Sequence, residues 1–340
     1  MTQLILRFCL AAIAAVVASP VGAQPATDFY KGKTITFALG SEGGSGYETH
    51  TRLLARHLGN HIPGNPSTLV QNMPGASSIR AANYVYNVAP KDGTVIAAVQ
   101  RTVPFEPLFG NSAAQYDVAK INWLGNTAKE IGLVVVWHSA PHQTAADIFK
   151  YEMIVGGAGP GTGTEQYARA LNTILGAKLR IVSGYQNMAP LTLAMERGEI
   201  QGNANWSWSS IQNSRPDWLR DNKIRLLMHV GLKDIPERPE VPSVLTLARS
   251  DEERQIFEVL MYNSSLGRPF FLGPDIPKDR IEALQKAFMI TMADKDFLED
   301  AKKTKLDIDP HSGDEVRDIV LKAYAFPQDI ITKARNAIQP

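Results

Sequence analysis

The chain has 340 residues, of which 44% are hydrophobic and 20% charged, with a formal net charge of +1. This composition is typical of a globular protein and excludes a wholly disordered or collagen-like chain. The near-zero charge and the lack of Lys/Arg runs argue against a nucleic-acid-binding protein. The length favours two domains over one. Beyond the N-terminal segment no run of about 18 apolar residues occurs, so we do not expect the mature chain to span a membrane.

The first 23 residues have the pattern of a cleaved secretory signal peptide. Arg7 provides a basic start, an apolar stretch follows, and Val21 and Ala23 occupy the −3 and −1 positions of a cleavage site. A buried or membrane-anchoring helix is the alternative, but the segment is short and a Pro-Val-Gly break follows it. The single cysteine, Cys9, lies within the segment. We therefore expect a mature chain without disulfides, thiolate nucleophiles or cysteine-bound metals.

Apolar runs alternate with stretches of helical periodicity over the first two thirds of the mature chain. This alternation predicts an α/β architecture with largely parallel sheets. Strands are expected, in chain order, at 34–39, 68–71, 94–99, 133–137, 153–155, 179–182 and 224–230. Helices are expected at 47–58, 167–175 and 190–197, and after Ser250, Pro277 and Ser312, so the last third is mostly helical. The absence of a long linker indicates that the chain crosses between its two halves on short strands.

Two glycine-rich loops each join a predicted strand to a predicted helix: GSEGGSG at 40–46 and GGAGPGTGT at 156–164. The first turn of a helix has unpaired N–H groups and partial positive charge, so it attracts anions, and glycines allow a close approach. Four hydroxyl side chains add donors: Ser41, Ser45, Thr162 and Thr164. One such loop is equally explained as a tight connector with a Ser or Thr N-cap. Two loops in different halves favour a site for a small anion.

The spacing of these glycines does not fit three enzyme motifs. In a dinucleotide fingerprint the last glycine would fall on Thr49 or Gln166. A Walker loop requires a lysine, and neither loop contains one. The nucleophile elbow requires glycine two residues after the serine, where Ser45 is followed by Tyr47.

Several histidines are candidate metal ligands. His50, His57 and His61 lie near one helical face, but no further ligand cluster accompanies them. We therefore expect solvated surface histidines, with no metal and no cofactor. His138 and His142 flank Pro141 in a loop and are interpreted as structural.

Three further features are candidates for ligand recognition. Segment 203–210 (NANWSWSS) is interpreted either as a pocket wall or as two core tryptophans with capping serines. Arg101 follows a predicted strand and either binds a carboxylate or lies on the surface. Glu130 either selects a cationic group or is exposed to solvent.

Other segments carry a family resemblance. NMPGASSIRAANYVYNVAPKDGT occurs at 72–94, SGYQ at 183–186 and LAMERGEIQG at 193–202. Together with the two glycine-rich loops, they resemble the Bug family, the periplasmic solute receptors of tripartite tricarboxylate transporters. The resemblance extends from residue 28 to about residue 333.

The resemblance implies an α/β, two-lobed periplasmic binding protein of the Venus-flytrap type, type II-like, with the ligand cleft between the lobes. Its function would be to capture a small organic carboxylate in the periplasm and deliver it to membrane permease subunits, without catalysis, as a monomer. A secreted hydrolase or isomerase acting on a small carboxylate in the same cleft is the alternative. A secreted structural or interaction module is a third interpretation.

The resemblance also places lobe 1 at 28–133 and 230–340, and lobe 2 at 134–229. The resemblance implies ligand-binding residues in the two loops and in the segment after the second strand: Ser41, Gly43, Gly44, Ser45, Gly46, Tyr47, Met73, Pro74, Gly75, Ala76, Ser77, Gly159, Gly161, Thr162, Gly163, Thr164 and Gln166. To these we add, as residues expected on the cleft walls, Arg101, Tyr185, Asn205 and Trp206. Many relatives have Asp in place of Glu48 and Gln201, and His or another polar group near Gln166. These departures leave the identity of the ligand open.

Overall fold

The computed structural model describes residues 29–340, so the predicted signal segment and Cys9 lie outside the described residues. The first of its two sheets has the strand order β11-β4-β10-β3-β1-β2. Its strands are β1 (Thr34–Leu39), β2 (Ser67–Asn72), β3 (Val95–Ala98), β4 (Asn122–Asn126), β10 (Pro269–Leu272) and β11 (His311–Ser312). β1 pairs in parallel with β2 and β3, whereas β10 is antiparallel to β3 and β4.

The second sheet has the order β7-β6-β8-β5-β9. Its strands are β5 (Gly132–Trp137), β6 (Met153–Gly156), β7 (Leu179–Val182), β8 (Gly202–Ser207) and β9 (Ile224–Val230). β6 is parallel to β7 and β8, but β5 is antiparallel to β8 and β9. The expectation of largely parallel sheets is therefore wrong. Both sheets are mixed because strands from other parts of the chain run in the opposite direction to their neighbours: β10 and the edge strand β11 in the first sheet, and β5 in the second.

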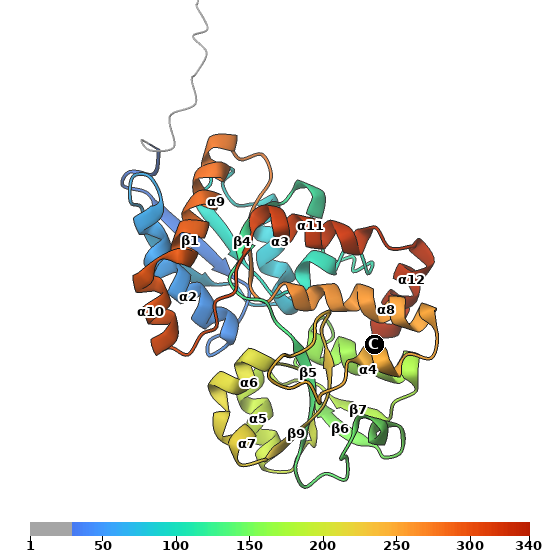
Figure 1. Ribbon diagram of the computed structural model, residues 1–340. Helices are drawn as coiled ribbons and strands as arrows, with labels where there is room; N and C mark the ends of the chain where they lie inside the picture. The colour runs from blue at the N-terminus through green and yellow to red at the C-terminus, as the bar shows by residue number, and fades with distance from the viewer. Residues whose placement is uncertain (1–28) are drawn as a thin grey trace, which may run out of the picture.

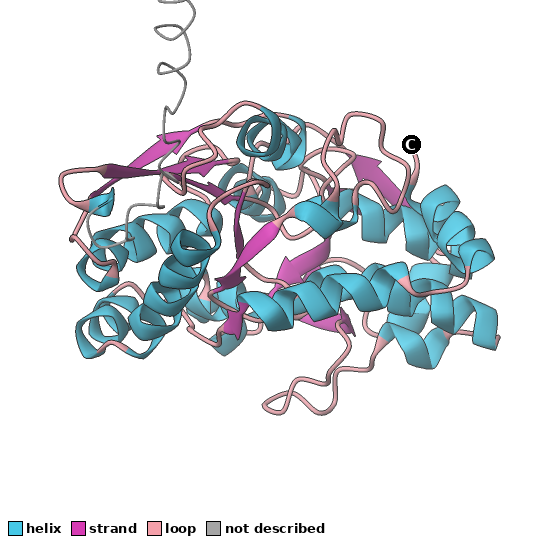
Figure 2. Cartoon of the chain, turned by 90° about the horizontal axis from the view of Figure 1, so that it is seen from above, coloured by secondary structure: helices cyan, strands magenta, loops and turns pink. Residues whose placement is uncertain are grey.

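Helices pack around both sheets, as Figures 1 and 2 show from two directions. The helices that accompany the first sheet are α2 (Gly46–Leu58), α3 (Ile79–Asn87), α9 (Lys278–Ala293), α10 (Lys295–Lys303) and α11 (Gly313–Tyr324). Those that accompany the second are α4 (Gly163–Leu175), α5 (Met188–Glu196), α6 (Trp208–Ser214) and α7 (Pro216–Arg220). None of the helices between residues 29 and 340 is long and apolar enough to cross a membrane.

The chain passes from the first sheet to the second between β4 and β5, through residues 127–131. After β9 it returns through α8 (Asp251–Met261) to β10, and it ends with α12 (Gln328–Ile338). Both α8 and α12 pack on α4 of the second half, where the Tyr167 hydroxyl donates to the Leu260 carbonyl at 2.9 Å. The C-terminal third therefore packs against both halves (Figure 1).

The predicted apolar faces lie in the core. Leu54 and Leu58 of α2 are fully buried beside β1, and Tyr167 and Leu171 of α4 are buried against the second sheet. Several strands have the predicted bounds or extend them by one residue. Four strands were not expected from the sequence, namely β4, β8, β10 and β11, because they are short or interrupted by Asn, Gly and Pro.

A substitution at Gly125 tests how tightly α9 packs on the first sheet. A Cβ added at this position would lie 2.2 Å from Cε1 of Phe288. We expect Gly125→Ala to lower the free energy of unfolding by about 1–3 kcal/mol through overpacking, measured by urea denaturation. Gly176→Ala is the control, since Gly176 also has a positive φ, of +75°, but no atom within 4 Å of the added Cβ. An equal loss in both variants would show that backbone strain, and not the contact with Phe288, sets the cost.

Candidate functional site

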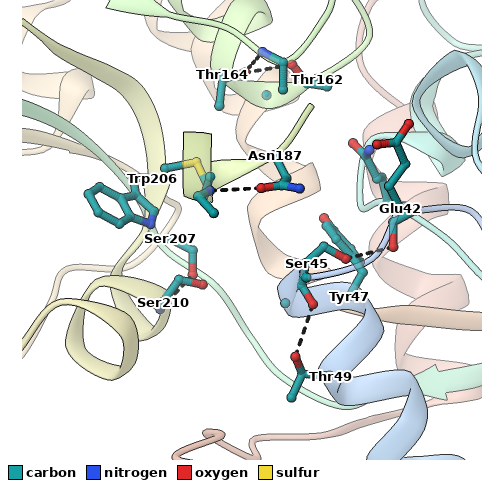
Figure 3. Close-up of a pocket in the computed structure, with 18 of the residues that line it drawn as sticks. Glu42, Ser45, Tyr47, Thr49, Thr162, Thr164, Asn187, Trp206, Ser207 and Ser210 are labelled. Atoms are coloured by element: carbon teal, nitrogen blue, oxygen red, sulfur yellow. Dashed lines mark hydrogen bonds between the residues drawn. The ribbon is translucent and has the colours of Figure 1, made fainter. Parts of the chain in front are cut away.

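A cavity of about 670 Å³ has walls from both halves of the molecule. Figure 3 shows Ser45 and Tyr47 on one side, Thr162 and Thr164 across from them, and Trp206, Ser207 and Ser210 along a third side. The predicted residues that line it are Ser41, Gly44, Ser45, Gly46, Tyr47, Pro74, Gly75, Ala76, Ser77, Arg101, Thr162, Gly163, Thr164, Tyr185, Asn205 and Trp206. The predicted residues outside its lining are Gly43, Met73, Gly159, Gly161 and Gln166.

The first glycine-rich loop begins α2 at the cavity. Ser45 is its N-cap, with a hydroxyl that accepts from the Glu48 N–H at 3.1 Å and lies 2.9 Å from the Ser41 hydroxyl. Among the described residues, no group accepts from the backbone N–H of Gly46 or Tyr47. The loop is thus a capped connector that also presents free donors.

The second loop begins α4 without a side-chain cap. The Thr162 hydroxyl is bonded to the Gly159 carbonyl at 2.7 Å and to the Thr164 hydroxyl at 2.8 Å, and it accepts from no backbone N–H of the helix. Within residues 29–340 the N–H groups of Gly163 and Thr164 have no acceptor. The partial positive charge of this helix end is therefore directed at the cavity.

Arg101 and Asn205 lie beside the start of α4. Their side chains come from opposite halves, and Nη2 of Arg101 donates to Oδ1 of Asn205 at 3.0 Å. The backbone N–H of Arg101 also donates to the Tyr47 hydroxyl at 3.3 Å. Arg101 is 7% exposed and Asn205 4%. Of the two interpretations of Arg101, the surface position does not hold.

Arg268 is a cavity residue that sequence reasoning missed. It lies directly before β10, which runs antiparallel to β3, so Arg268 and Arg101 lie at the same edge of the first sheet. Its guanidinium is 4.6 Å from the ring centre of Tyr47 and forms an ion pair with Glu130 at 3.1 Å. In the sequence Arg268 is a single arginine before a short apolar run, and this pattern does not indicate a position in a cavity.

Glu130 is not exposed to solvent, contrary to one of the two expectations. It is buried, and besides Arg268 it accepts from the hydroxyls of Ser207 and Ser209. A carboxylate whose oxygens are already bonded to the protein is not free to select a cationic ligand. The other interpretation is therefore not supported either.

Segment 203–210 combines both of its interpretations. Trp206 is buried, with its ring centre 5.7 Å from that of Trp218, and it also lines the cavity. Arg215, after α6, is a further lining residue that was not predicted. It donates through Nη2 to the Thr192 hydroxyl at 3.3 Å.

The departures from the family pattern have structural roles in this chain. Glu48 accepts from the N–H of Gly44 at 2.6 Å and from Arg52 at 2.8 Å, and these bonds hold its pKa below the usual value. Gln166 donates to Glu106 at 3.3 Å, and Gln201 accepts from the N–H of Ile154 at 2.9 Å. None of the three side chains lines the cavity.

The expectation that the three histidines on α2 and in the 3-10 turn after it are solvated is wrong. His50 is buried and its Nδ1 lies 3.2 Å from the Thr127 hydroxyl. His57 and His61 are largely covered and bond to Asp300 at 3.1 Å and Asp294 at 3.2 Å. The acidic partners come from the distant helix α10 and its N-cap, which local spacing does not reveal. Between residues 29 and 340, no three His, Cys, Asp or Glu side chains cluster in a way suited to a metal.

Comparison with known proteins identifies solved structures that share this fold. No protein-family model and no curated protein matches the chain. Solved structures do match it. A TctC solute binding protein from Polaromonas, solved without ligand, has a TM-score of 0.64 at 18% identity, over 89% of this chain and 99% of that chain. The periplasmic binding protein BugD has a TM-score of 0.69 at 15% identity, over 90% and 98%.

The chain has the fold of a periplasmic solute-binding protein. The expected two-lobed α/β fold class is therefore confirmed, and at the level of the fold so is the resemblance to the Bug family. MatC from Rhodopseudomonas palustris, solved with bound malate, also matches, with a TM-score of 0.65 at 17% identity over 90% of this chain and 99% of that chain.

His50 provides a pH-dependent test of this site. Burial, assisted by the Arg268 charge, holds the pKa of His50 well below 6.5. Its contribution to stability is therefore present above about pH 6.5 and decreases as the pH falls, because the unfolded chain then binds a proton that the folded chain does not. We expect His50→Asn to remove up to about 2 kcal/mol of the stability lost between pH 7.5 and pH 5, measured by urea denaturation. His138→Asn, an exposed position, is the control. An unchanged pH dependence in His50→Asn would contradict the prediction.

Proposed function

We propose that this protein is a periplasmic receptor that captures a small organic carboxylate. The observation that carries the proposal is the character of the unpaired atoms at the cavity. In the described part of the chain, every buried, unpaired side-chain polar atom of a lining residue is a hydrogen-bond donor: Nη1 of Arg101, Nδ2 of Asn205, Nε1 of Trp206, Nε of Arg215 and Nε of Arg268. The unpaired backbone N–H groups at the starts of α2 and α4 are hydrogen-bond donors as well.

A ligand that matches these groups must bring acceptors. An ionised carboxylate offers only acceptors, at two oxygens with about four lone-pair sites. Charge-assisted hydrogen bonds to such a group are shorter and stronger than neutral ones. Buried donors left without a partner cost free energy, and a bound carboxylate would recover it. The structure of MatC with malate and that of a similar R. palustris protein with adipate support this ligand class.

The donors are divided between the two halves of the molecule. This division supports a mechanism in which the halves close around the ligand. Arg101 and the start of α2 belong to the first half, whereas Asn205 and the start of α4 belong to the second. A ligand held by both binds the closed form better and so shifts the population towards it. We assign the lobes as 28–133 with 230–340, and 134–229. The predicted signal peptide and the fold support a periplasmic location and delivery, by a monomer, to a membrane permease of the tripartite tricarboxylate type.

A thermal-shift panel tests the function. The purified protein is heated with mono-, di- and tricarboxylates, amino acids and aromatic acids, each beside its neutral amide. A carboxylate at about 100 times its dissociation constant should add roughly 2.7 kcal/mol and raise the melting temperature by several degrees. The amides should have little effect. A flat panel, with no small molecule retained in native mass spectrometry, would contradict the receptor function, and turnover of a bound carboxylate would favour the hydrolase or isomerase.

Gly163 tests the role of the second loop. A Cβ at this position would lie 2.2 Å from Nδ2 of Asn205, so any side chain displaces a proposed ligand donor. We expect Gly163→Val to reduce the carboxylate-dependent thermal shift to less than half, because the start of α4 is blocked. Gly43→Val is the matched control, since the only atom within 4 Å of a Cβ added at Gly43 is Glu48 Oε2, at 3.7 Å, and Gly43 lies outside the cavity lining. Equal affinity in Gly163→Val and the wild type, measured by calorimetry, would refute the loop model.

A further inference from the structure

The cavity contains one buried charge that the protein leaves without a counter-ion. Among the lining residues described here, Arg101 is buried and makes no ion pair with a carboxylate. Its guanidinium has a single side-chain partner, the neutral amide of Asn205, and its Nη1 has none. A buried charge without a partner is costly, so its retention calls for an explanation.

The other arginines of the cavity differ from Arg101. Arg268 is neutralised by Glu130 at 3.1 Å. Arg215 is partly exposed, stacks 5.3 Å from the ring centre of Trp218 and donates through both of its terminal nitrogens to protein oxygens. Water and these contacts screen its charge.

Two buried carboxylates near the second loop, Glu106 and Glu165, form no ion pair with Arg101. Glu106 accepts from Asn111 at 2.7 Å and from Gln166 at 3.3 Å, and it makes no ion pair with any described residue. Burial raises the pKa of Glu106, which favours its neutral form. Glu165, in the first turn of α4, is paired with Arg169 at 2.7 Å.

The unpaired donors around Arg101 converge on the start of α4. A Cβ placed on Gly163 would lie 2.2 Å from Nδ2 of Asn205 and 3.8 Å from Nη2 of Arg101. Because Oδ1 of Asn205 accepts from Arg101, its Nδ2 is left to donate elsewhere, and no described atom accepts from it. The free N–H groups of Gly163 and Thr164 belong to the same helix end.

We propose that Arg101 is the counter-ion of the ligand's anionic group and that this group binds at the start of α4, among Arg101, Asn205 and the N–H groups of Gly163 and Thr164. The proposal rests on the proposed carboxylate-receptor function and deepens it. The starts of α4 and α2 then make different kinds of interaction with the ligand. The α4 end supplies one full positive charge, whereas the α2 end, beside the neutral Arg268–Glu130 pair, supplies hydrogen bonds for an uncharged part of the ligand. Arg101 is thereby the residue that selects an anion over a neutral amide of the same shape.

The test uses acetate, malate and adipate as probes, each with its amide, on the wild type, Arg101→Gln and Arg101→Lys. We expect at least one carboxylate to bind the wild type and to bind Arg101→Gln about 10- to 100-fold more weakly in calorimetry. Arg101→Lys keeps the charge and should lose less than tenfold. Arg220→Gln, at an exposed arginine paired with Asp221, is the charge-matched control and should bind as the wild type does.

A second readout separates ligand recognition from a structural role. Without any probe, the melting temperature of Arg101→Gln should equal or exceed that of the wild type, because an uncompensated buried charge has been removed. A lower melting temperature together with retained carboxylate affinity would show that Arg101 is structural, and would overturn the proposal.

The remaining outcomes are also decisive. Binding of a carboxylate by Arg101→Gln within about twofold of the wild type overturns the role of Arg101 and leaves the receptor function intact. If the wild type binds none of the three probes, the same comparison is made with the carboxylate that gives the largest shift in the thermal panel, and a panel without any shift overturns both proposals. If Arg101→Gln does not fold, Arg101→Lys decides: a loss below tenfold supports the charge role, and a larger loss overturns it.

Discussion

The buried ion pair between Arg268 and Glu130 connects three parts of the site. Glu130 lies in the segment that carries the chain from the first sheet to the second, and it accepts from Ser207 and Ser209 on the far wall of the cavity. Arg268 covers the ring of Tyr47 at the start of α2. Removing one partner of such a pair leaves an uncompensated buried charge, at a cost of about 3–5 kcal/mol. The crossing segment, the first loop and the cavity wall are therefore positioned together.

The same pair makes the two glycine-rich loops chemically different, although their sequences look alike. At the first loop Ser45 caps the helix, and Glu130 neutralises the nearby Arg268. At the second loop the Thr162 hydroxyl caps no backbone N–H, and the nearby Arg101 has no counter-ion among the described residues. Similar loops thus provide one neutral and one electropositive end, and this difference depends on residues far from either loop in the sequence.

Sequence patterns predicted the parts of the fold that depend on local order. β1, β7 and β9 have the expected bounds because each is a run rich in β-branched and apolar residues between turn signals. β10 and β4 were missed because their pairing is decided by distant segments, and Arg268 was missed with them. His57 and His61 were mistaken for exposed residues because their acidic partners come from α10 and its N-cap. The positions of the two glycine-rich loops were predicted because a few adjacent residues are enough to indicate the start of a helix.

The distribution of unpaired donors ties stability to function. A folded protein usually satisfies its buried polar groups, and each unsatisfied donor costs about 1–3 kcal/mol. Within residues 29–340, half of the unpaired buried side-chain atoms belong to residues that line one cavity, and there they are all donors. Of the five remaining atoms, three are also donors and two are histidine ring nitrogens, so what distinguishes the cavity is that its unpaired donors are concentrated in one place. An anion bound between the two halves would pair with these donors, and it would pair with all of them only when both halves contact it. The groups that recognise the anion would therefore also supply the free energy that favours closure.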